Sequence, residues 1–158
     1  MSAPTDADRR WLLEAIDLSR RCPPTDTGYC VGAIIVSAEG TKLAEGYSRE
    51  SDRHVHAEES ALAKLAGTPV GLTDATIYSS LEPCSIRKSR PRTCTRLILD
   101  AGIRRVVFAL REPPQFADCH GVELLREGGV EVIEISELGQ LVRDVNAQVL
   151  MPPSGKQR

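Results

Sequence analysis

The feature that constrains this chain most is a set of three potential metal ligands in three separate segments. His56 belongs to the stretch His54–Glu59, Cys84 follows a Glu-Pro pair, and Cys94 comes after a spacer. A neutral imidazole and two thiolates are the three protein ligands of a catalytic zinc site, which keeps a fourth position open. The sequence therefore predicts Zn²⁺ as a cofactor, bound by His56, Cys84 and Cys94.

Glu58 lies two residues after His56, where its carboxylate could face the open position without binding the metal. This placement predicts a general acid/base beside the zinc. One alternative is a structural zinc site, which would need a fourth protein ligand. The candidates for that ligand are His54, Cys30 and His120, and a chance combination of common residues is the other alternative.

The spacer between the two cysteines, Ser85–Thr93, holds Arg87, Lys88, Arg90 and Arg92 and no acidic residue. One interpretation is a solvated surface loop. The functional interpretation is an anion clamp beside the metal, because the guanidinium fork binds phosphate in a bidentate manner. A short nucleic-acid contact is a weaker third alternative.

Composition favours a single domain that acts on a small molecule. The 158 residues predict one domain, over residues 8–150, with disordered tails at 1–7 and 151–158. The net charge of −2 and the aromatic content of 4% argue against nucleic acid as a partner. Five cysteines without framework spacing favour metal binding or free thiols, and so a cytoplasmic location. No apolar run is long enough for a membrane span, and the first ten residues lack the apolar segment of a signal peptide.

Hydrophobic periodicity predicts helices alternating with strands after an initial hairpin. We expect helices over residues 7–21, 56–65, about 94–102, 121–127 and 138–149. We expect strands over residues 30–37, 41–46, 75–81, 105–110 and 130–135, the last at a sheet edge. This order predicts an α/β fold, a three-layer α-β-α sandwich with a five-stranded mixed sheet. The potential metal ligands fall where open α/β sheets place their sites, at a strand end and at helix starts.

At these residues the chain resembles the zinc-dependent cytidine/deoxycytidylate deaminase superfamily, and within it the deaminase domain of riboflavin biosynthesis. The matching stretches are Val31–Val36, His56–Glu58, Leu81–Ser85 and Ala101–Val106, with Gly121–Val132 similar in character. The resemblance implies His56, Cys84 and Cys94 as zinc ligands and Glu58 as proton shuttle. It also implies that backbone groups around Ser80 and Cys84 hold the substrate amine, and that the chain forms a homo-dimer or tetramer.

The chain departs from the family pattern at positions that concern the substrate. Gly28 stands where the family has a ring-contacting Asn, Ile86 stands where it has a His, and Glu112–Gln115 replaces an Asp-Pro-Asn-Pro loop. The reductase domain that often follows has no counterpart in this sequence. The residues expected to contact substrate are Gly28, Ser80, Arg87, Arg90 and Arg92.

The expected function is hydrolytic removal of a ring amine, as ammonia, from a pyrimidine-type base, nucleoside or nucleotide. The substrate could be the phosphoribosylamino-pyrimidinone of the riboflavin pathway, a cytosine nucleotide or an unusual base of secondary metabolism. The contrasting alternative is a non-catalytic, zinc-stabilised binding protein that keeps the deaminase fold. Glu58 discriminates between these classes, because a binding protein has no need of an acid at that position.

Overall fold

The computed structural model describes residues 3–113 and 119–150. It contains a five-stranded sheet with the strand order β2-β1-β3-β4-β5. Strand β1 runs antiparallel to both of its neighbours, β2 and β3, whereas β3, β4 and β5 run parallel to one another. The predicted mixed sheet is confirmed, and β5 lies at an edge as expected. The strands are β1 (Gly32–Val36), β2 (Lys42–Tyr47), β3 (Thr76–Leu81), β4 (Arg105–Leu110) and β5 (Glu131–Glu134).

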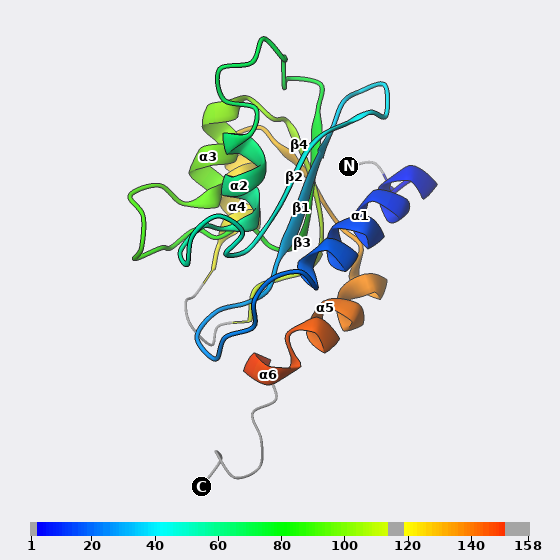
Figure 1. Ribbon diagram of the computed structural model, residues 1–158. Coiled ribbons are helices and arrows are strands. Elements are labelled where there is room, and N and C mark those ends of the chain that lie inside the picture. The colour runs from blue at the N-terminus through cyan, green and yellow to red at the C-terminus, as the bar shows by residue number, and fades with distance from the viewer. Residues whose placement is uncertain (1–2, 114–118, 151–158) are drawn as a thin grey trace, which may run out of the picture.

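Helices cover both faces of the sheet and complete the predicted three layers (Figure 1). On one face lie α2 (Ala57–Ala63), α3 (Cys94–Ala101) and α4 (Gly121–Glu127). On the other lie α1 (Asp6–Ser19), α5 (Gly139–Val145) and α6 (Ala147–Leu150), with a short 3₁₀ turn, Ser136–Leu138, before α5. The core accordingly divides into two apolar clusters, one on each side of the sheet. Strand β1 is buried along its whole length, which explains its continuous apolar sequence.

A glycine in β2 sets the position of the helix that begins beside His56. A Cβ atom on Gly46 would lie 2.6 Å from the backbone oxygen of Ala57 and 2.6 Å from the backbone nitrogen of Ala61. Only a residue without a side chain lets α2 pack this closely on the strand. The contact fixes the first turn of α2, where the predicted acid/base is located.

The first helix begins earlier than its apolar periodicity indicates. Thr5 accepts a hydrogen bond from the backbone N–H of Asp8 at 3.0 Å, and the Asp8 carboxylate accepts one from the Thr5 N–H at 2.9 Å. This capping box satisfies two unpaired donors, so α1 begins at Asp6 rather than Ala7. Its start precedes the domain boundary expected at residue 8. The tail expected at 151–158 lies outside the described residues.

The single C-terminal helix predicted over residues 138–149 is wrong, because the structure has α5 and α6 with a break at Asn146. The buried Asn146 side chain accepts a hydrogen bond from the backbone N–H of Cys30 at 2.6 Å and donates one to the Cys30 carbonyl at 3.1 Å. A tertiary contact therefore interrupts the helix at Asn146. No helix in the described part of the chain is long and apolar enough to cross a bilayer.

Candidate active site

Three structural elements bring the predicted metal ligands together. His56 is the N-cap of α2, Cys84 follows β3, and Cys94 is the first residue of α3. The ligand atoms of these three residues all lie within 4.8 Å of one another. The Nδ1 atom of His56 is 3.5 Å from the Cys84 sulfur and 3.4 Å from the Cys94 sulfur. The prediction that these segments meet is confirmed.

The spacing of these donors fits a tetrahedral zinc ion. With Zn–S of about 2.3 Å and Zn–N of about 2.0 Å, a tetrahedral angle separates the nitrogen from each sulfur by about 3.5 Å. The two observed distances agree with this value. Among the described residues, no fourth His, Cys, Asp or Glu joins the group, so none of the fourth-ligand candidates, His54, Cys30 and His120, belongs to it. Within the described residues, therefore, the donor set is that of an open site rather than a closed structural one.

Hydrogen bonds prepare the Cys84 sulfur for metal binding. A hydrogen bond from the Cys94 thiol, with further ones from the His56 ring and the Cys94 backbone N–H, lowers the pKa of the Cys84 thiol to about 4. The backbone N–H of Cys94 lies 3.2 Å from this sulfur, and the Thr95 N–H donates to the Cys84 carbonyl at 3.1 Å. The start of α3 therefore holds Cys84 as the thiolate that a metal requires.

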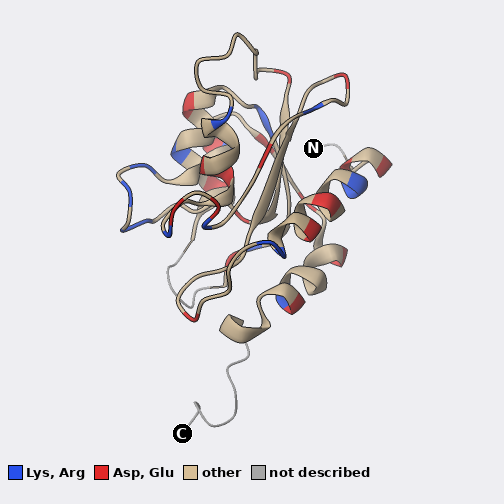
Figure 2. Cartoon of the chain, viewed as in Figure 1, with Lys and Arg blue, Asp and Glu red and all other residues tan. Residues whose placement is uncertain are grey.

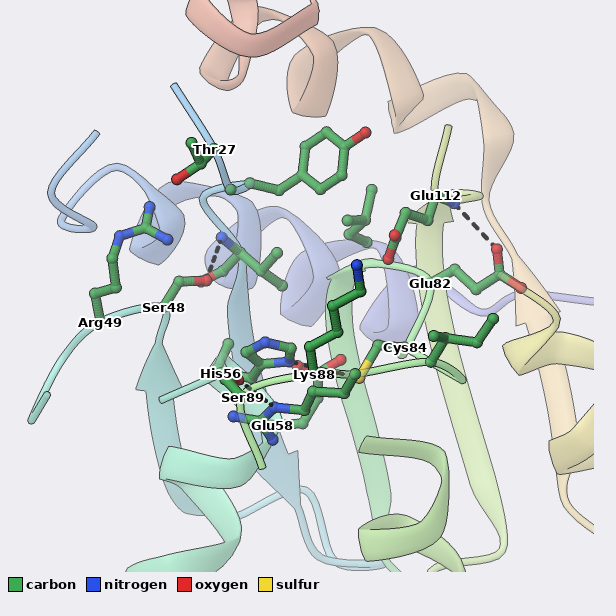
Figure 3. A pocket seen from close by; sticks show the side chains of 17 residues that line it. Thr27, Ser48, Arg49, His56, Glu58, Glu82, Cys84, Lys88, Ser89 and Glu112 are labelled. Carbon is green, nitrogen blue, oxygen red and sulfur yellow. Dashed lines mark hydrogen bonds between the residues drawn. The ribbon is translucent and has the colours of Figure 1, made fainter. Parts of the chain in front are cut away.

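Glu58 lies in the first turn of α2 and is only 3% exposed. Burial, and then the neighbouring Cys84, raises the pKa of its carboxyl group. The Ser79 hydroxyl is 3.1 Å from Glu58 Oε2 and 2.8 Å from the Leu81 carbonyl oxygen. Glu58, His56 and Cys84 line one cavity of about 440 Å³ (Figure 3). A buried acid thus lies beside the potential metal ligands on the wall of a space large enough for a small ring compound.

Comparison with known proteins identifies the family of this chain. The family model for the cytidine and deoxycytidylate deaminase zinc-binding region matches residues 5–110. The chain belongs to this deaminase family. The match confirms the family resemblance read from the residues, and the three clustered ligands lie within the zinc-binding region that it describes.

Individual relatives within the deaminase family differ in what their names say they act on. The chain is 42% identical over 126 residues to a diaminohydroxyphosphoribosylamino-pyrimidine deaminase of Schizosaccharomyces pombe, a match that covers 78% of this chain and 31% of that protein. It is 34% identical over 135 residues to a cytosine deaminase of Candida albicans, which covers 82% of this chain and 81% of that protein.

A solved structure shows the same fold. It is a diaminohydroxyphosphoribosylaminopyrimidine deaminase/5-amino-6-(5-phosphoribosylamino)uracil reductase of Thermotoga maritima, with a TM-score of 0.80 and 30% identity. The match covers 96% of this chain and 42% of that one. The chain therefore spans about a third of the length of the S. pombe relative and less than half of the T. maritima protein.

Some of the residues expected to contact substrate line the cavity, and others do not. Gly28 and Arg87 line the cavity, whereas Ser80, Arg90 and Arg92 do not. The Ser80 side chain is fully buried, and its hydroxyl accepts the backbone N–H of Gly32 at 3.1 Å. The Ser80 side chain therefore does not line the cavity, and a substrate contact through the backbone around Ser80 stays a prediction.

Acidic residues from other segments engage the arginines of the spacer, which lies beside acidic residues in Figure 2. Arg90 pairs with Asp52 at 2.6 Å, and Arg92 pairs with Asp100 at 2.8 Å. Arg87 donates to the Glu59 carboxylate at 2.7 Å and to a backbone carbonyl at 2.7 Å. The three guanidinium groups pair within the protein, and the anion clamp predicted for Arg87, Lys88, Arg90 and Arg92 stays a prediction.

Two charged residues that the sequence analysis noted, but did not include among the expected substrate contacts, line the cavity. Lys88 is exposed and has no hydrogen bond or ion pair to any other described residue, and Glu112 is partly buried; both are labelled in Figure 3. Burial, with the nearby Cys84, Glu82 and Glu58, raises the pKa of Glu112 to about 7. The place of Glu112 directly after buried β4, at the strand end where α/β sheets put their sites, is the signal that could have indicated it.

Glu82 holds the backbone segments near Glu112 in place. Its buried carboxylate accepts the backbone N–H of Glu112 at 3.0 Å and that of Val122 at 3.0 Å. A Cβ atom on Gly121 would lie 2.1 Å from the Pro83 carbonyl oxygen, so α4 approaches the Glu-Pro-Cys segment directly. Glu82 therefore joins the end of β4 and the start of α4 to the segment that carries Cys84.

Proposed function

We propose that this chain is a zinc-dependent hydrolytic deaminase that removes a ring amine, as ammonia, from a pyrimidine-type substrate. The observation that carries the proposal is the arrangement around the cavity. An open set of three ligands, His56, Cys84 and Cys94, adjoins a buried carboxylate, Glu58, on one cavity wall. A structural zinc site has no use for either the open position or the acid.

His56, Cys84 and Cys94 would hold the zinc ion, since their donor atoms match it in number, type and spacing. Zinc bound in such a site supplies Lewis acidity that lowers the pKa of water to near neutrality. The remaining chemistry belongs to the residues of the chain.

Glu58 moves the protons in the proposed reaction. Its carboxylate would accept a proton from the attacking water and deliver protons to the ring nitrogen and then to the leaving amine. Burial favours this role, because a raised pKa brings a carboxyl group closer to the pH at which it can both accept and donate. The Ser79 hydroxyl, 3.1 Å from Oε2, keeps the carboxylate aimed at the cavity.

Two observations support a substrate class: the names of the relatives, and a lysine of the cavity that has no acidic partner among the described residues. The S. pombe and C. albicans relatives are both named for amino-pyrimidines, and only the first name includes a phosphoribosyl group. Lys88 lines the cavity without an acidic partner among the described residues. We propose a substrate that carries a phosphate, as a phosphoribosylamino-pyrimidinone does.

A second candidate is an uncharged cytosine-type base. The observation that favours it is the internal pairing of the three arginines, which leaves the spacer with one free cation among its described residues, Lys88. Homo-oligomers and a cytoplasmic location stay predictions from the sequence and its family resemblance.

The deciding experiment measures ammonia release from a panel of amino-pyrimidines, with and without phosphate, by the zinc-loaded protein and by Glu58→Gln. Loss of one positioned acid/base typically reduces the rate by about 10²–10⁴-fold. We expect Glu58→Gln to keep its zinc and its thermal unfolding transition while losing turnover. Full activity in that variant would refute the mechanism. No turnover of any amino-pyrimidine by wild type with bound zinc would favour the binding-protein alternative.

A further inference from the structure

A pair of buried cysteines lies behind the cavity wall, away from the metal ligands. Cys22 follows α1 and Cys30 precedes β1, and both are free thiols that are 4% and 3% exposed. One nitrogen of Arg49 contacts both sulfur atoms, at 2.8 Å from Cys22 and 3.4 Å from Cys30. The Arg49 Nε atom donates to the Pro23 carbonyl at 3.0 Å. The two thiols and the guanidinium group therefore form one cluster, which the proposed reaction does not use.

Arg49 connects this cluster to the cavity. It lines the cavity, and a Cβ atom on Gly28 would lie 3.1 Å from its NH1 atom. Its backbone φ of 61° is in the left-handed region, which no other non-glycine residue in the described ranges occupies. Such a conformation persists when surrounding contacts enforce it. The contacts of the Arg49 side chain with the two sulfurs thus help to hold the wall that contains Gly28.

The two thiols differ in reactivity. A hydrogen bond from the Cys22 thiol, together with the positive charge of Arg49, lowers the pKa of the Cys30 thiol to about 7. At pH 7 about half of such a thiol is ionised, against about 3% of one with the ordinary pKa of about 8.5. A thiolate of lower pKa is less nucleophilic, which offsets part of the gain from the larger ionised fraction. The Cys30 thiol should therefore react about threefold faster than an ordinary thiol.

A second cavity gives small molecules a route to the pair. Its volume is about 340 Å³, and both cysteines line it together with Ser19, Arg20 and Asp144. Hydrogen peroxide is small enough to enter. Larger thiol reagents would be hindered by the low exposure of the two sulfurs.

We propose that Cys22 and Cys30 form a peroxide-sensitive site that closes to a reversible disulfide and releases Arg49 from the sulfur atoms. The Cys30 thiolate attacks one oxygen of hydrogen peroxide, the O–O bond breaks, and Cys30 becomes a sulfenic acid as hydroxide leaves. The Cys22 sulfur then attacks the Cys30 sulfur, the S–O bond breaks, and water leaves with the Cys22 proton. Two thiols and one peroxide give one disulfide and two waters, and a dithiol reductant reverses the change.

The test treats the zinc-loaded full chain with limiting hydrogen peroxide, followed by alkylation, digestion and mass spectrometry. Cys119 is an internal control, because it is partly exposed and burial raises the pKa of its thiol to about 12. We expect a peptide pair cross-linked between Cys22 and Cys30 to appear before Cys119 is oxidised and before zinc is released. Dithiothreitol should restore both thiols. Oxidation of Cys119 or loss of zinc before any such cross-link would overturn the proposal.

Two variants test the roles of Cys22 and Arg49 in the formation of the disulfide. Cys22→Ser cannot close the bridge, so a dimedone-type probe should label the sulfenic acid at Cys30. Arg49→Gln should slow disulfide formation by up to about threefold, whereas Arg20→Gln, on an arginine that lines the same second cavity, should not. Absence of a Cys30 adduct in Cys22→Ser would contradict the assigned order of attack, even if Arg49→Gln failed to fold.

Hydrogen–deuterium exchange tests the link to Arg49 and needs no substrate. The backbone N–H of Arg49 donates to the Val55 carbonyl at 2.8 Å, so its exchange reports on this segment. Oxidation should speed exchange in residues 49–55, since Arg49 loses its sulfur contacts. A disulfide that leaves this exchange unchanged would overturn the coupling to the cavity wall. These readouts do not depend on the deaminase reaction, so their outcome is separable from that of the proposed function.

Discussion

Replacing Lys88 with Ala tests how the cavity recognises an anionic substrate. Lys88 lines the cavity from the spacer between Cys84 and Cys94, and among the described residues it has no acidic partner. The neighbouring Arg87 side chain is 2% exposed and is held by Glu59. Lys88 is therefore the spacer cation that can meet a substrate phosphate without first breaking an internal ion pair.

The expected magnitude follows from the exposure of this lysine. A hydrogen bond to a charged group is worth about 1.5–3 kcal/mol when it is well shielded. Two unit charges 4 Å apart interact by about 1 kcal/mol in water and about 4 kcal/mol near a protein surface. Lys88 is exposed, so we take about 1–1.5 kcal/mol, which is a loss of kcat/KM of about five- to thirteenfold because each 1.36 kcal/mol is about tenfold.

The assay compares kcat/KM for a phosphorylated amino-pyrimidine and for its matched uncharged base. We expect Lys88→Ala to reduce the first and leave the second within about twofold, and added salt to weaken only the first in wild type. Arg92→Ala is the matched control, because Arg92 lies outside the cavity and pairs with Asp100. An equal loss with both substrates, or an equal effect of Arg92→Ala, would refute the assignment of Lys88.

Two further predictions concern the metal site and the scaffold. Cys84→Ala should abolish retention of about one zinc per chain, as measured by metal analysis after dialysis, whereas Cys119→Ala should keep it; equal zinc in both would remove Cys84 from the site. Burial alone would raise the pKa of Asp8, but hydrogen bonds from Arg105, the Thr5 N–H and Tyr78 outweigh it and hold that pKa well below its usual range. The stability that Asp8 contributes is therefore complete above its unfolded pKa of about 4 and is lost as pH falls below that value. Asp8→Asn should lower the free energy of unfolding at pH 7 by about 2–3 kcal/mol, less than for a fully buried pair because Arg105 is 24% exposed. In urea unfolding between pH 5 and pH 2, the free energy of unfolding should fall less steeply with decreasing pH for Asp8→Asn than for wild type. An equal slope for the two proteins would contradict this account.

The three metal ligands could be predicted from the sequence because each of them lies at the start or the end of a helix or strand. His56 precedes a helix, Cys84 follows a buried strand, and Cys94 opens a helix. These elements have strong periodic patterns, and the sheet order places their ends together. Glu58 follows from the same logic, since it lies within one helical turn of His56.

Contacts between residues far apart in the chain could not be predicted in this way. The stripe of apolar residues before and after Asn146 continues with helical spacing, yet the helix breaks there. The cause is a pair of hydrogen bonds to the Cys30 backbone, 116 residues away in sequence. Likewise, nothing in the spacer itself shows that Arg90 pairs with Asp52, 38 residues earlier.

The pairing of Arg87 shows how a cluster of cations is held beside the metal ligands by acids of the protein itself. Glu59 accepts a hydrogen bond from the backbone N–H of His56 at 3.2 Å and one from Arg87 at 2.7 Å, both at the same carboxylate oxygen. One acid thus links the helix start that carries the His ligand to the spacer that joins the two Cys ligands. Because Arg87 is 2% exposed, this charge pair is shielded from solvent and holds both segments in place. The absence of acidic residues in the spacer suits its contact with the acidic first turn of α2 through Glu59, and among the described spacer cations Lys88 alone lies outside these ion pairs and lines the cavity.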